Sequence, residues 1–224
     1  MPLIEIQNLN KTYVVDDTSF VGVEDISLSI DRGDFLSIVG HSGSGKTTLI
    51  SIIGGILRPT SGQVLLDGVD ICSLDDNALS EYRSKRIGFM FQFASLLPIL
   101  TAKENVLLPG IFSPGQVPTD EKKAESYLEL VGIGEKKDAY PSQLSGGQQR
   151  RVAIARALIN EPDIILADEP TGDLDEETEA EIMALFKDIN EKKGVTIILI
   201  THNMGLAGQA KKHLRMSQGK LEEI

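Results

Sequence analysis

The first thirty residues alternate between apolar and polar side chains, a pattern that is typical of strands. One strand is predicted over 4–9 and a second over 23–30, with a turn region at 17–22 between them. Farther along, a short apolar run lies at 35–39, further strands are predicted at 63–66 and 87–91, and buried strands are predicted at 164–167 and 196–200. A last hairpin is expected over 214–224, turning at Ser217-Gln218-Gly219.

Apolar positions three and four residues apart predict helices between these strands. The first covers 46–57 and ends before Arg58-Pro59, because proline cannot continue a helix. A long stretch, about 93–159, holds helical patterns at 101–108, 121–131 and 146–159, and we interpret it as a mostly helical insertion. A later helix begins at Asp175 and buries one face, formed by Ile182, Leu185, Phe186 and Ile189. Buried strands that alternate with helices indicate an α/β fold with a parallel sheet covered on both faces.

The composition narrows the possible environments and partners. The chain has 224 residues, 41% of them hydrophobic, and a formal net charge of −11. Phosphate backbones repel so acidic a chain, which argues against nucleic acid as a direct partner. No apolar run approaches the ~18 residues that span a bilayer, and the segment 1–11 lacks the apolar core of a signal peptide. We therefore expect a soluble, cytoplasmic unit over 1–224 without direct membrane insertion.

The segment Gly40-His41-Ser42-Gly43-Ser44-Gly45-Lys46-Thr47 fits the pattern G-x-x-x-x-G-K-[ST] and lies between a predicted strand and a predicted helix. Its glycines let backbone N–H groups approach phosphate oxygens, and the helix N-terminus adds unpaired donors. Lys46 supplies a point charge to the outer phosphates, and the Thr47 hydroxyl is a hard oxygen ligand that suits Mg²⁺. The alternative is a glycine-rich turn with a solvated lysine.

Two acids, Asp168 and Glu169, follow the apolar run at 164–167. Ligands of open parallel sheets bind beyond the carboxyl ends of the strands, so these acids should face the glycine-rich segment. We expect Asp168 to hold Mg²⁺ through water, and Glu169 to orient or deprotonate the water that attacks the γ-phosphate. Taken alone, the pair is equally consistent with an ordinary acidic start of a loop.

The segment Leu144-Ser145-Gly146-Gly147-Gln148 opens the helix predicted at 146–159. Ser145 and Gln148 have the spacing of a capping box, so a well-capped helix is the simplest interpretation. Two glycines in a first turn lower helix stability, however, and they make sense if a ligand must approach closely. A second anion-binding helix terminus in the same chain suggests one nucleotide that is held from opposite sides by two copies.

Together these segments resemble the ATP-binding subunits of ABC transporters. Residues 144–148 match the LSGGQ signature of that family in full, 40–47 match its Walker A motif and 164–169 its Walker B motif, in the same order. The resemblance implies a P-loop NTPase core with an N-terminal antiparallel β subdomain and an inserted helical subdomain. It also implies ATP hydrolysis with Mg²⁺ by a homodimer. In this dimer ATP would lie between residues 40–48 of one copy, which include Thr48, and Ser145, Gly146, Gly147 and Gln148 of the other copy.

Further residues take roles through this resemblance. Tyr13 matches the aromatic residue that stacks on adenine, although a tyrosine that packs within a strand would look the same. Gln92 matches the glutamine that reaches Mg²⁺ and the attacking water, and His202 matches the switch histidine that contacts the γ-phosphate. The implied metal-binding set is Thr47, Gln92 and Asp168, and the implied catalytic set is Glu169, His202, Gln92 and Lys46.

The pattern over 91–109 is similar to the branch of the family that serves lipoprotein release, macrolide export and cell division. This similarity implies a separate transmembrane permease that contacts the region from Gln92 to Asn105, and a peripheral location on the inner face of the cell membrane. His41 stands where this branch often has proline, and Asn203 follows the histidine where an acid is frequent. Neither change removes a reactive group.

Other functions fit less of the sequence. A soluble ABC ATPase acting on the ribosome is the main alternative, but such proteins usually carry two cassettes, and the acidic charge disfavours RNA. A regulatory module without turnover would not need Glu169 and His202. A small-molecule kinase would leave the helix that starts after Ser145 without a purpose. The sequence names neither the transported molecule nor the permease.

Overall fold

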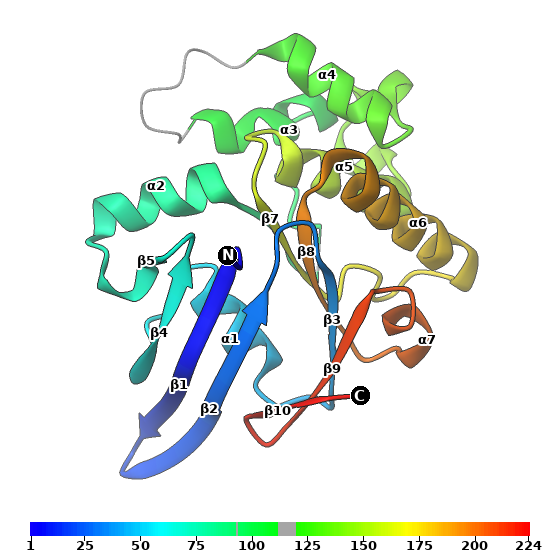
Figure 1. Cartoon of the computed structure of the whole chain (residues 1–224). Helices are drawn as coiled ribbons and strands as arrows, with labels where there is room; N and C mark the ends of the chain where they lie inside the picture. Colours follow the sequence, from blue (N-terminus) through cyan, green and yellow to red (C-terminus); the bar gives the residue numbers. More distant parts are fainter. Residues whose placement is uncertain (93, 112–119) are drawn as a thin grey trace.

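The computed structural model of the protein describes residues 1–92, 94–111 and 120–224. Its strands are β1 (Ile4–Val15), β2 (Thr18–Ile30), β3 (Phe35–Val39), β4 (Ser61–Leu66), β5 (Val69–Asp70), β6 (Ile87–Met90), β7 (Ile164–Asp168), β8 (Thr196–Thr201), β9 (Lys212–Ser217) and β10 (Lys220–Glu223). Within the described residues they form two sheets (Figure 1). The larger sheet has the order β10-β9-β3-β8-β7-β6 and is parallel except for β10. The smaller sheet, β2-β1-β4-β5, is antiparallel.

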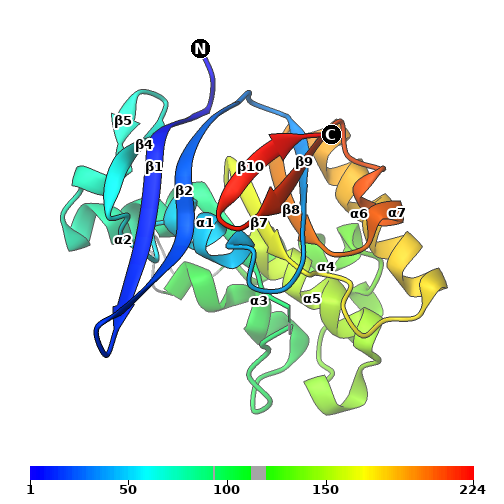
Figure 2. The same cartoon turned by 90° about the horizontal axis from the view of Figure 1, so that it is seen from below.

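The helices are α1 (Lys46–Ile53), α2 (Asp76–Arg86), α3 (Ala102–Ile111), α4 (Glu121–Leu130), α5 (Gly146–Leu158), α6 (Glu176–Lys193) and α7 (Met204–Ala207). Figure 2 shows α1 between the two sheets. On the other face of the larger sheet lie α5 and α6, and α3 and α4 pack against α5 (Figure 1). The predicted α/β fold, with a covered parallel sheet and an antiparallel N-terminal part, is confirmed.

Two hydrophobic clusters hold these layers together, one on each face of the larger sheet. In β8, the odd-numbered Ile197 and Leu199 join the cluster that includes α5 and α6. The even-numbered Ile198 and Ile200 join the cluster that includes α1 and the smaller sheet. Because successive side chains of a strand point to opposite faces, a strand that is apolar at every position serves both clusters.

Several predicted boundaries are wrong: the strand expected over 4–9 continues to Val15, and the helix expected over 101–108 continues to Ile111. The turn region expected at 17–22 belongs mostly to β2, and the chain turns at Asp16 and Asp17, whose φ angles are 45° and 63°. Aspartate tolerates this left-handed conformation, which a tight hairpin requires. The helix expected over 46–57 ends at Ile53, because Gly55 takes a φ of 66° that terminates the helix before Arg58-Pro59 is reached.

Sequence periodicity missed two helices and one short strand, namely α2, α7 and β5. Helix α2 buries only Leu79 and Tyr82, so its apolar face is too narrow to stand out in the sequence. A cap marks its start instead: the Asp75 side chain accepts a hydrogen bond from the backbone N–H of Ala78 at 2.8 Å.

The insertion expected at about 93–159 contains α3, α4 and α5. Helix α5 contacts α3 and α4 on one side and β6 and α6 on the other, so it joins the predicted insertion to the sheet. Residues 93 and 112–119 of this segment lie outside the described residues. A separate helical subdomain within a single unit over 1–224 stays a prediction.

The topology brings the carboxyl ends of three neighbouring strands together. In the registers of the larger sheet, Val39 of β3 pairs with Thr201 of β8, and Asp168 of β7 pairs with Ile200. The segments that follow these strands therefore begin side by side, as the parallel arrangement requires. Among the described residues, no helix is both long and apolar enough to cross a bilayer.

Candidate functional site

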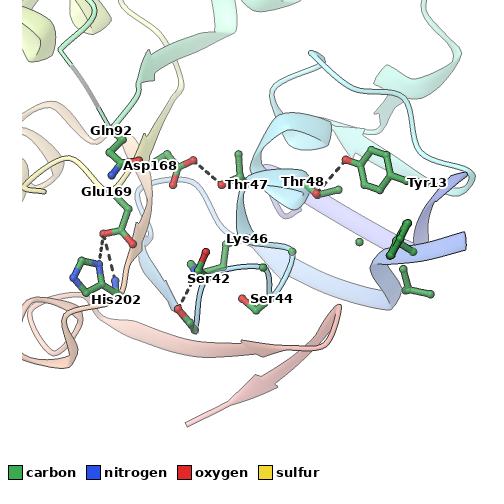
Figure 3. A pocket seen from close by; sticks show the side chains of 16 residues that line it. Tyr13, Ser42, Ser44, Lys46, Thr47, Thr48, Gln92, Asp168, Glu169 and His202 are labelled. Carbon is green, nitrogen blue, oxygen red and sulfur yellow. Dashed lines mark hydrogen bonds and ion pairs between the residues drawn. The ribbon is translucent and has the colours of Figure 1, made fainter. Parts of the chain in front are cut away.

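A cavity of about 560 Å³ lies where these strand ends meet the smaller sheet. It is lined by residues of the glycine-rich segment and by residues that follow β6, β7 and β8, and on one side by the hairpin of β1 and β2. Figure 3 shows Tyr13 at one end of the cavity, Glu169 and His202 at the other, and Lys46 between them. The predicted residues that line it are Tyr13, Gly40, Ser42, Gly43, Ser44, Gly45, Lys46, Thr47, Thr48, Gln92, Asp168, Glu169 and His202.

The glycine-rich segment has a backbone that side chains would obstruct. Gly45 is left-handed, with a φ of 105°, and an added Cβ would lie 2.0 Å from the carbonyl oxygen of Gly22. An added Cβ on Gly40 would lie 2.3 Å from the carbonyl oxygen of Met216. The segment then enters α1 without a side-chain cap, so the first amides of that helix have no capping partner. Such a curled backbone at a helix N-terminus is a general anion-binding arrangement.

Lys46 and Ser44 add polar side-chain atoms to this curled backbone. Lys46 is 8% exposed, and its Nζ donates to the carbonyl oxygens of Gly40 at 2.7 Å and His41 at 2.9 Å. Among the described residues, the Oγ of Ser44 is buried without a hydrogen-bond partner. An unsatisfied buried hydroxyl in the same segment as a lysine ammonium fits a phosphate, which accepts hydrogen bonds from both groups. The His41 side chain is exposed and is not part of the lining.

Thr47 and Asp168 meet across the cavity floor, where the Thr47 hydroxyl donates to Oδ2 of Asp168 at 2.9 Å (Figure 3). Burial raises the pKa of Asp168, the hydrogen bond from Thr47 lowers it, and the neighbouring Glu169 charge raises it again. In the described part of the chain, no group of three or more His, Cys, Asp or Glu side chains could hold a metal. Mg²⁺ commonly uses one carboxylate, a hydroxyl, phosphates and waters, so this pair fits Mg²⁺ bound together with a nucleotide.

Glu169 and His202 form a contact at the far end of the cavity. Oε2 of Glu169 lies 3.0 Å from Nδ1 of His202. The carboxylate of Glu169 is largely buried, with 17% of its side chain exposed, whereas 74% of the His202 side chain is exposed. A shielded carboxylate that is held by a neighbouring imidazole is positioned to accept a proton from water.

Gln92 completes the row of polar groups at the strand ends. It follows β6, lines the cavity beside Asp168 and Glu169, and is exposed. Its Cγ lies 3.8 Å from the position that a Cβ of Gly172 would take, so the side chain lies over the loop that follows Glu169. A side-chain amide in this position offers both a donor and an acceptor to a bound water.

The opposite end of the cavity is apolar. Tyr13 is 37% exposed, and its hydroxyl lies 3.2 Å from Oγ1 of Thr48. Phe20 pairs with Tyr13 across the hairpin, and Phe20 and Val21 are exposed and line the cavity. Sequence reasoning assigned both to a turn and so missed them. The high strand propensity of an aromatic residue followed by a β-branched one could have marked them as strand residues. An aromatic ring beside apolar walls suits a planar base.

The four residues from Ser145 to Gln148 are not brought to this cavity. They form the start of α5, where the Ser145 hydroxyl accepts from the N–H of Gln148 at 3.2 Å and Gln148 Oε1 accepts from the N–H of Ser145 at 3.0 Å. Ser145 and Gly146 are exposed, so a molecule outside the chain can reach this helix end. The predicted capping box is confirmed, and the expected contact with the nucleotide of a second copy stays a prediction.

Comparisons with known proteins agree with this geometry. Residues 23–172 match the family model described as ABC transporter. The macrolide export ATP-binding/permease protein MacB of Syntrophobacter fumaroxidans is 46% identical over 224 residues, which cover 99% of this chain but 31% of that protein. This chain thus spans about a third of the length of that relative. The lipoprotein-releasing system ATP-binding protein LolD of Syntrophus aciditrophicus is 41% identical over 219 residues, 98% of each chain.

Solved structures give the same result. The dimeric structure of a post-hydrolysis state of the ATP-binding cassette MJ0796, bound to ADP and Pi, superposes with a TM-score of 0.89, at 40% identity over 98% of both chains. MJ0796 comes from Methanocaldococcus jannaschii. A second dimeric structure of the same cassette superposes with a TM-score of 0.88, at 41% identity. At this identity, both the fold and the sequence of the chain are similar to those of the cassette.

Proposed function

This chain belongs to the ABC transporter family and is an ATP-binding, ATP-hydrolysing cassette of it; from this premise we propose how its residues divide the work. Each active site forms between two copies: one copy contributes the cavity residues, and the other contributes the α5 terminus from Ser145 to Gln148. MgATP binds at both sites of the dimer. The cycle of closing and opening drives a separate permease in the membrane.

One observation carries this proposal: the chain has two surfaces suited to bind phosphate, the cavity and the N-terminus of α5, and they do not face each other. The cavity is open and contains Lys46, Asp168 and Glu169, while the exposed Ser145 lies outside its lining. A bound γ-phosphate would be contacted from one side only, unless a second molecule supplied the other side. The dimeric cassette structures among its solved neighbours support that arrangement.

The cavity residues have complementary tasks toward ATP. Tyr13 stacks on the base, amides of the glycine-rich segment hold the phosphates, and the Lys46 ammonium offsets the charge on the outer ones. Thr47, Asp168 and Gln92 would hold Mg²⁺, which neutralises charge that develops on the phosphates. Glu169 accepts a proton from the attacking water, and His202 and Gln92 orient the γ-phosphate and that water. Transfer of the γ-phosphoryl group to water yields ADP and phosphate.

The γ-phosphate also explains how hydrolysis changes the conformation. With ATP bound, the amides and hydroxyl at the α5 terminus of the second copy contact the γ-phosphate and hold the dimer closed. When hydrolysis removes the γ-phosphate, this contact is lost, and the closed dimer loses its advantage over the open one.

Complementation between two inactive variants tests the composite site. Lys46→Ala removes the phosphate charge, and Gly146→Asp places a carboxylate at the exposed helix end, where it repels phosphate but is compatible with the helix dipole. Each variant alone should lose ATPase activity about a hundredfold. Mixed, they form heterodimers with one intact site, which joins the cavity of the Gly146→Asp copy to the helix end of the Lys46→Ala copy. Recovery of activity on mixing supports the proposal, and a mixture as inactive as its parts contradicts it.

The permease is proposed to contact the surface around the segment that follows β6, between Gln92 and Asn105. Phe91, Leu97 and Ile99 expose 45%, 44% and 80% of their surface there, and Asn105 is fully buried beneath them. Asn105 accepts from the N–H of Leu97 at 2.7 Å and donates to the carbonyl oxygens of Leu97, Leu100 and Thr101, which fixes the loop. Exposed apolar side chains on a fixed loop are typical of a docking surface. The names of MacB and LolD support a membrane partner, and hence a location on the inner face of the cell membrane.

A charge on this surface tests the docking. Ile99→Asp should abolish co-purification of a membrane protein from detergent-solubilised membranes. It should leave the ATPase activity of the isolated chain within about twofold, because a substitution at so exposed a position costs little stability. Val69→Asp is a matched control, since Val69 is 57% exposed on β5 outside this segment. Equal capture by both variants would place the permease elsewhere.

A further inference from the structure

We propose that Arg150 is a positioning residue that ties the α5 terminus, which serves one active site of the dimer, to Gln92 and Glu169, which serve the other. This inference rests on the composite site proposed above. It adds a physical route by which the two sites act together, through one buried guanidinium group in each copy.

Arg150 links three segments that are far apart in the chain. It lies in the second turn of α5 and is 5% exposed. One of its terminal nitrogens, Nη1, donates to the carbonyl oxygen of Phe91 at 3.3 Å, and the other, Nη2, donates to that of Gly172 at 3.0 Å. These acceptors are 59 and 22 residues away in the sequence. The rigid fork of a guanidinium group fixes both acceptors relative to the helix.

Both acceptors lie next to residues of the active site. Phe91 directly precedes Gln92. Gly172 donates its N–H to the carbonyl oxygen of Glu169 at 3.1 Å, and Gln92 lies against it. A shift of α5 would therefore pull on the backbone of both Gln92 and Glu169.

The start of α5 also packs closely against the same loop and against the first turn of α6. An added Cβ on Gly147 would lie 2.5 Å from Cγ2 of Thr178, and one on Gly146 would lie 3.3 Å from Cδ2 of Leu174. The helix end that receives the second copy's nucleotide therefore moves together with the loop that follows Glu169. Arg150 is the polar connection within this unit, and it alone among these contacts also reaches the segment of Gln92.

Burying the charge of Arg150 lowers the stability of the fold, so a role in packing alone would be served better by an apolar side chain. Within the described residues it forms no ion pair, and burial lowers the pKa of its guanidinium group, with partial compensation from the Asp173 charge. A buried cation without a carboxylate partner is destabilising compared with an apolar side chain of similar size. The neighbouring Arg151, by contrast, donates to the carbonyl oxygen of Val131 at 2.8 Å and pairs with Glu181 at 2.7 Å. Arg151 therefore serves as a control.

The experiment uses the complemented pair of Lys46→Ala and Gly146→Asp copies. In the single intact site of this pair, the Gly146→Asp copy supplies the cavity and the Lys46→Ala copy supplies the helix end. Arg150→Met is placed either in the copy that supplies the cavity or in the copy that supplies the helix end. If Arg150 ties both halves, each placement should lower kcat about tenfold, the effect expected for losing charge-assisted hydrogen bonds, and change the KM for ATP less than about twofold. Arg151→Met, placed the same way, should change kcat less than about twofold.

The outcomes separate this inference from the one it rests on. A complemented pair that is inactive before Arg150 is changed contradicts the composite site itself. An active pair in which Arg150→Met lowers kcat in one placement only, or no more than Arg151→Met does, overturns the link through Arg150. Arg150→Lys, which can reach one of the two carbonyl oxygens, should recover part of the activity in both placements, and thermal unfolding of each variant accounts for any loss of folded protein.

Discussion

Oε2 of Glu169 accepts from two groups of His202: it lies 3.0 Å from the ring nitrogen Nδ1 and 3.4 Å from the backbone nitrogen. The two residues follow neighbouring parallel strands, and the backbone N–H of Glu169 donates to the carbonyl oxygen of Ile200 at 2.9 Å. Glu169 also has a φ of 49°, which turns its side chain out of the strand direction. The sheet therefore fixes the direction of this carboxylate before substrate arrives, and proton acceptance from water depends on that direction.

Glu169→Gln keeps the shape of the side chain and removes its ability to accept a proton. We expect the rate of ATP hydrolysis to fall about a hundredfold or more, the range of general-base catalysis. ATP binding should persist, so the variant should elute as a dimer with ATP and as a monomer with ADP in size-exclusion chromatography. A variant that hydrolyses ATP at the wild-type rate would remove Glu169 from the role of base.

His202→Ala removes the imidazole that holds the carboxylate. Hydrogen bonds to charged groups contribute about 1.5–3 kcal/mol, so kcat should fall about tenfold to a hundredfold. The KM for ATP should change much less, because the residues that contact the adenine and the α- and β-phosphates are intact. His202→Gln retains a donor and should recover part of the rate. Steady-state kinetics on the three proteins decides between this role and a purely structural one, which would lower stability without this split.

Asp168→Asn removes a carboxylate whose pKa burial raises. Because the folded-state pKa lies above the unfolded-state value, the ionised form costs stability at neutral pH, and this cost disappears as pH falls below the unfolded-state pKa. The nucleotide-free variant should therefore melt up to about 3 °C higher at pH 7, and the gain should shrink as the pH is lowered toward about 4. The same variant should lose Mg²⁺-dependent ATPase activity. A lower melting temperature at pH 7 would contradict the assigned cost.

Ser44→Ala removes a buried hydroxyl that has no partner within the described residues. A hydroxyl without a hydrogen bond does not stabilise the free protein, so the melting temperature without nucleotide should stay the same or rise. The dissociation constant for ATP should increase about threefold to tenfold, because the hydrogen bond to phosphate is lost. Titration with ATP and thermal unfolding without it measure both effects. Unchanged ATP affinity would show that the hydroxyl does not face the phosphates.

Tyr13→Ala removes the aromatic ring at the apolar end of the cavity. Stacking of a base on an aromatic side chain contributes about 1–3 kcal/mol, so the KM for ATP should rise about fivefold to a hundredfold with little change in kcat. Tyr13→Phe keeps the ring and loses only the hydroxyl that lies 3.2 Å from Thr48, and its KM should stay within about threefold of wild type. If Tyr13→Ala bound ATP normally, the base would have to lie elsewhere, for example against Phe20 alone.

Much of this protein follows from local sequence. The strand that ends at Asp168 and the helix that begins after Ser145 were predictable, because burial on both faces produces an unbroken apolar run and capping needs a specific side chain at one position. The glycine-rich segment was predictable for a similar reason. The left-handed conformation at Gly45 and the close backbone contact at Gly40 both require glycine, so the residue types indicate the conformation directly.

Contacts between distant segments could not be predicted in this way. Helix α2 escaped notice because it buries few residues, and the aromatic pairing of Phe20 with Tyr13 depended on where the hairpin turns. The hydrogen bonds of Arg150 to Phe91 and Gly172 join three parts of the chain whose proximity no periodicity encodes. The sequence by itself determined most of the helices and strands, and which side chains can bind phosphate and metal, since these depend on neighbouring residues. The tertiary structure alone decided that Glu169 points at His202 and that Ser145 faces outward, because strand order and helix packing set those directions.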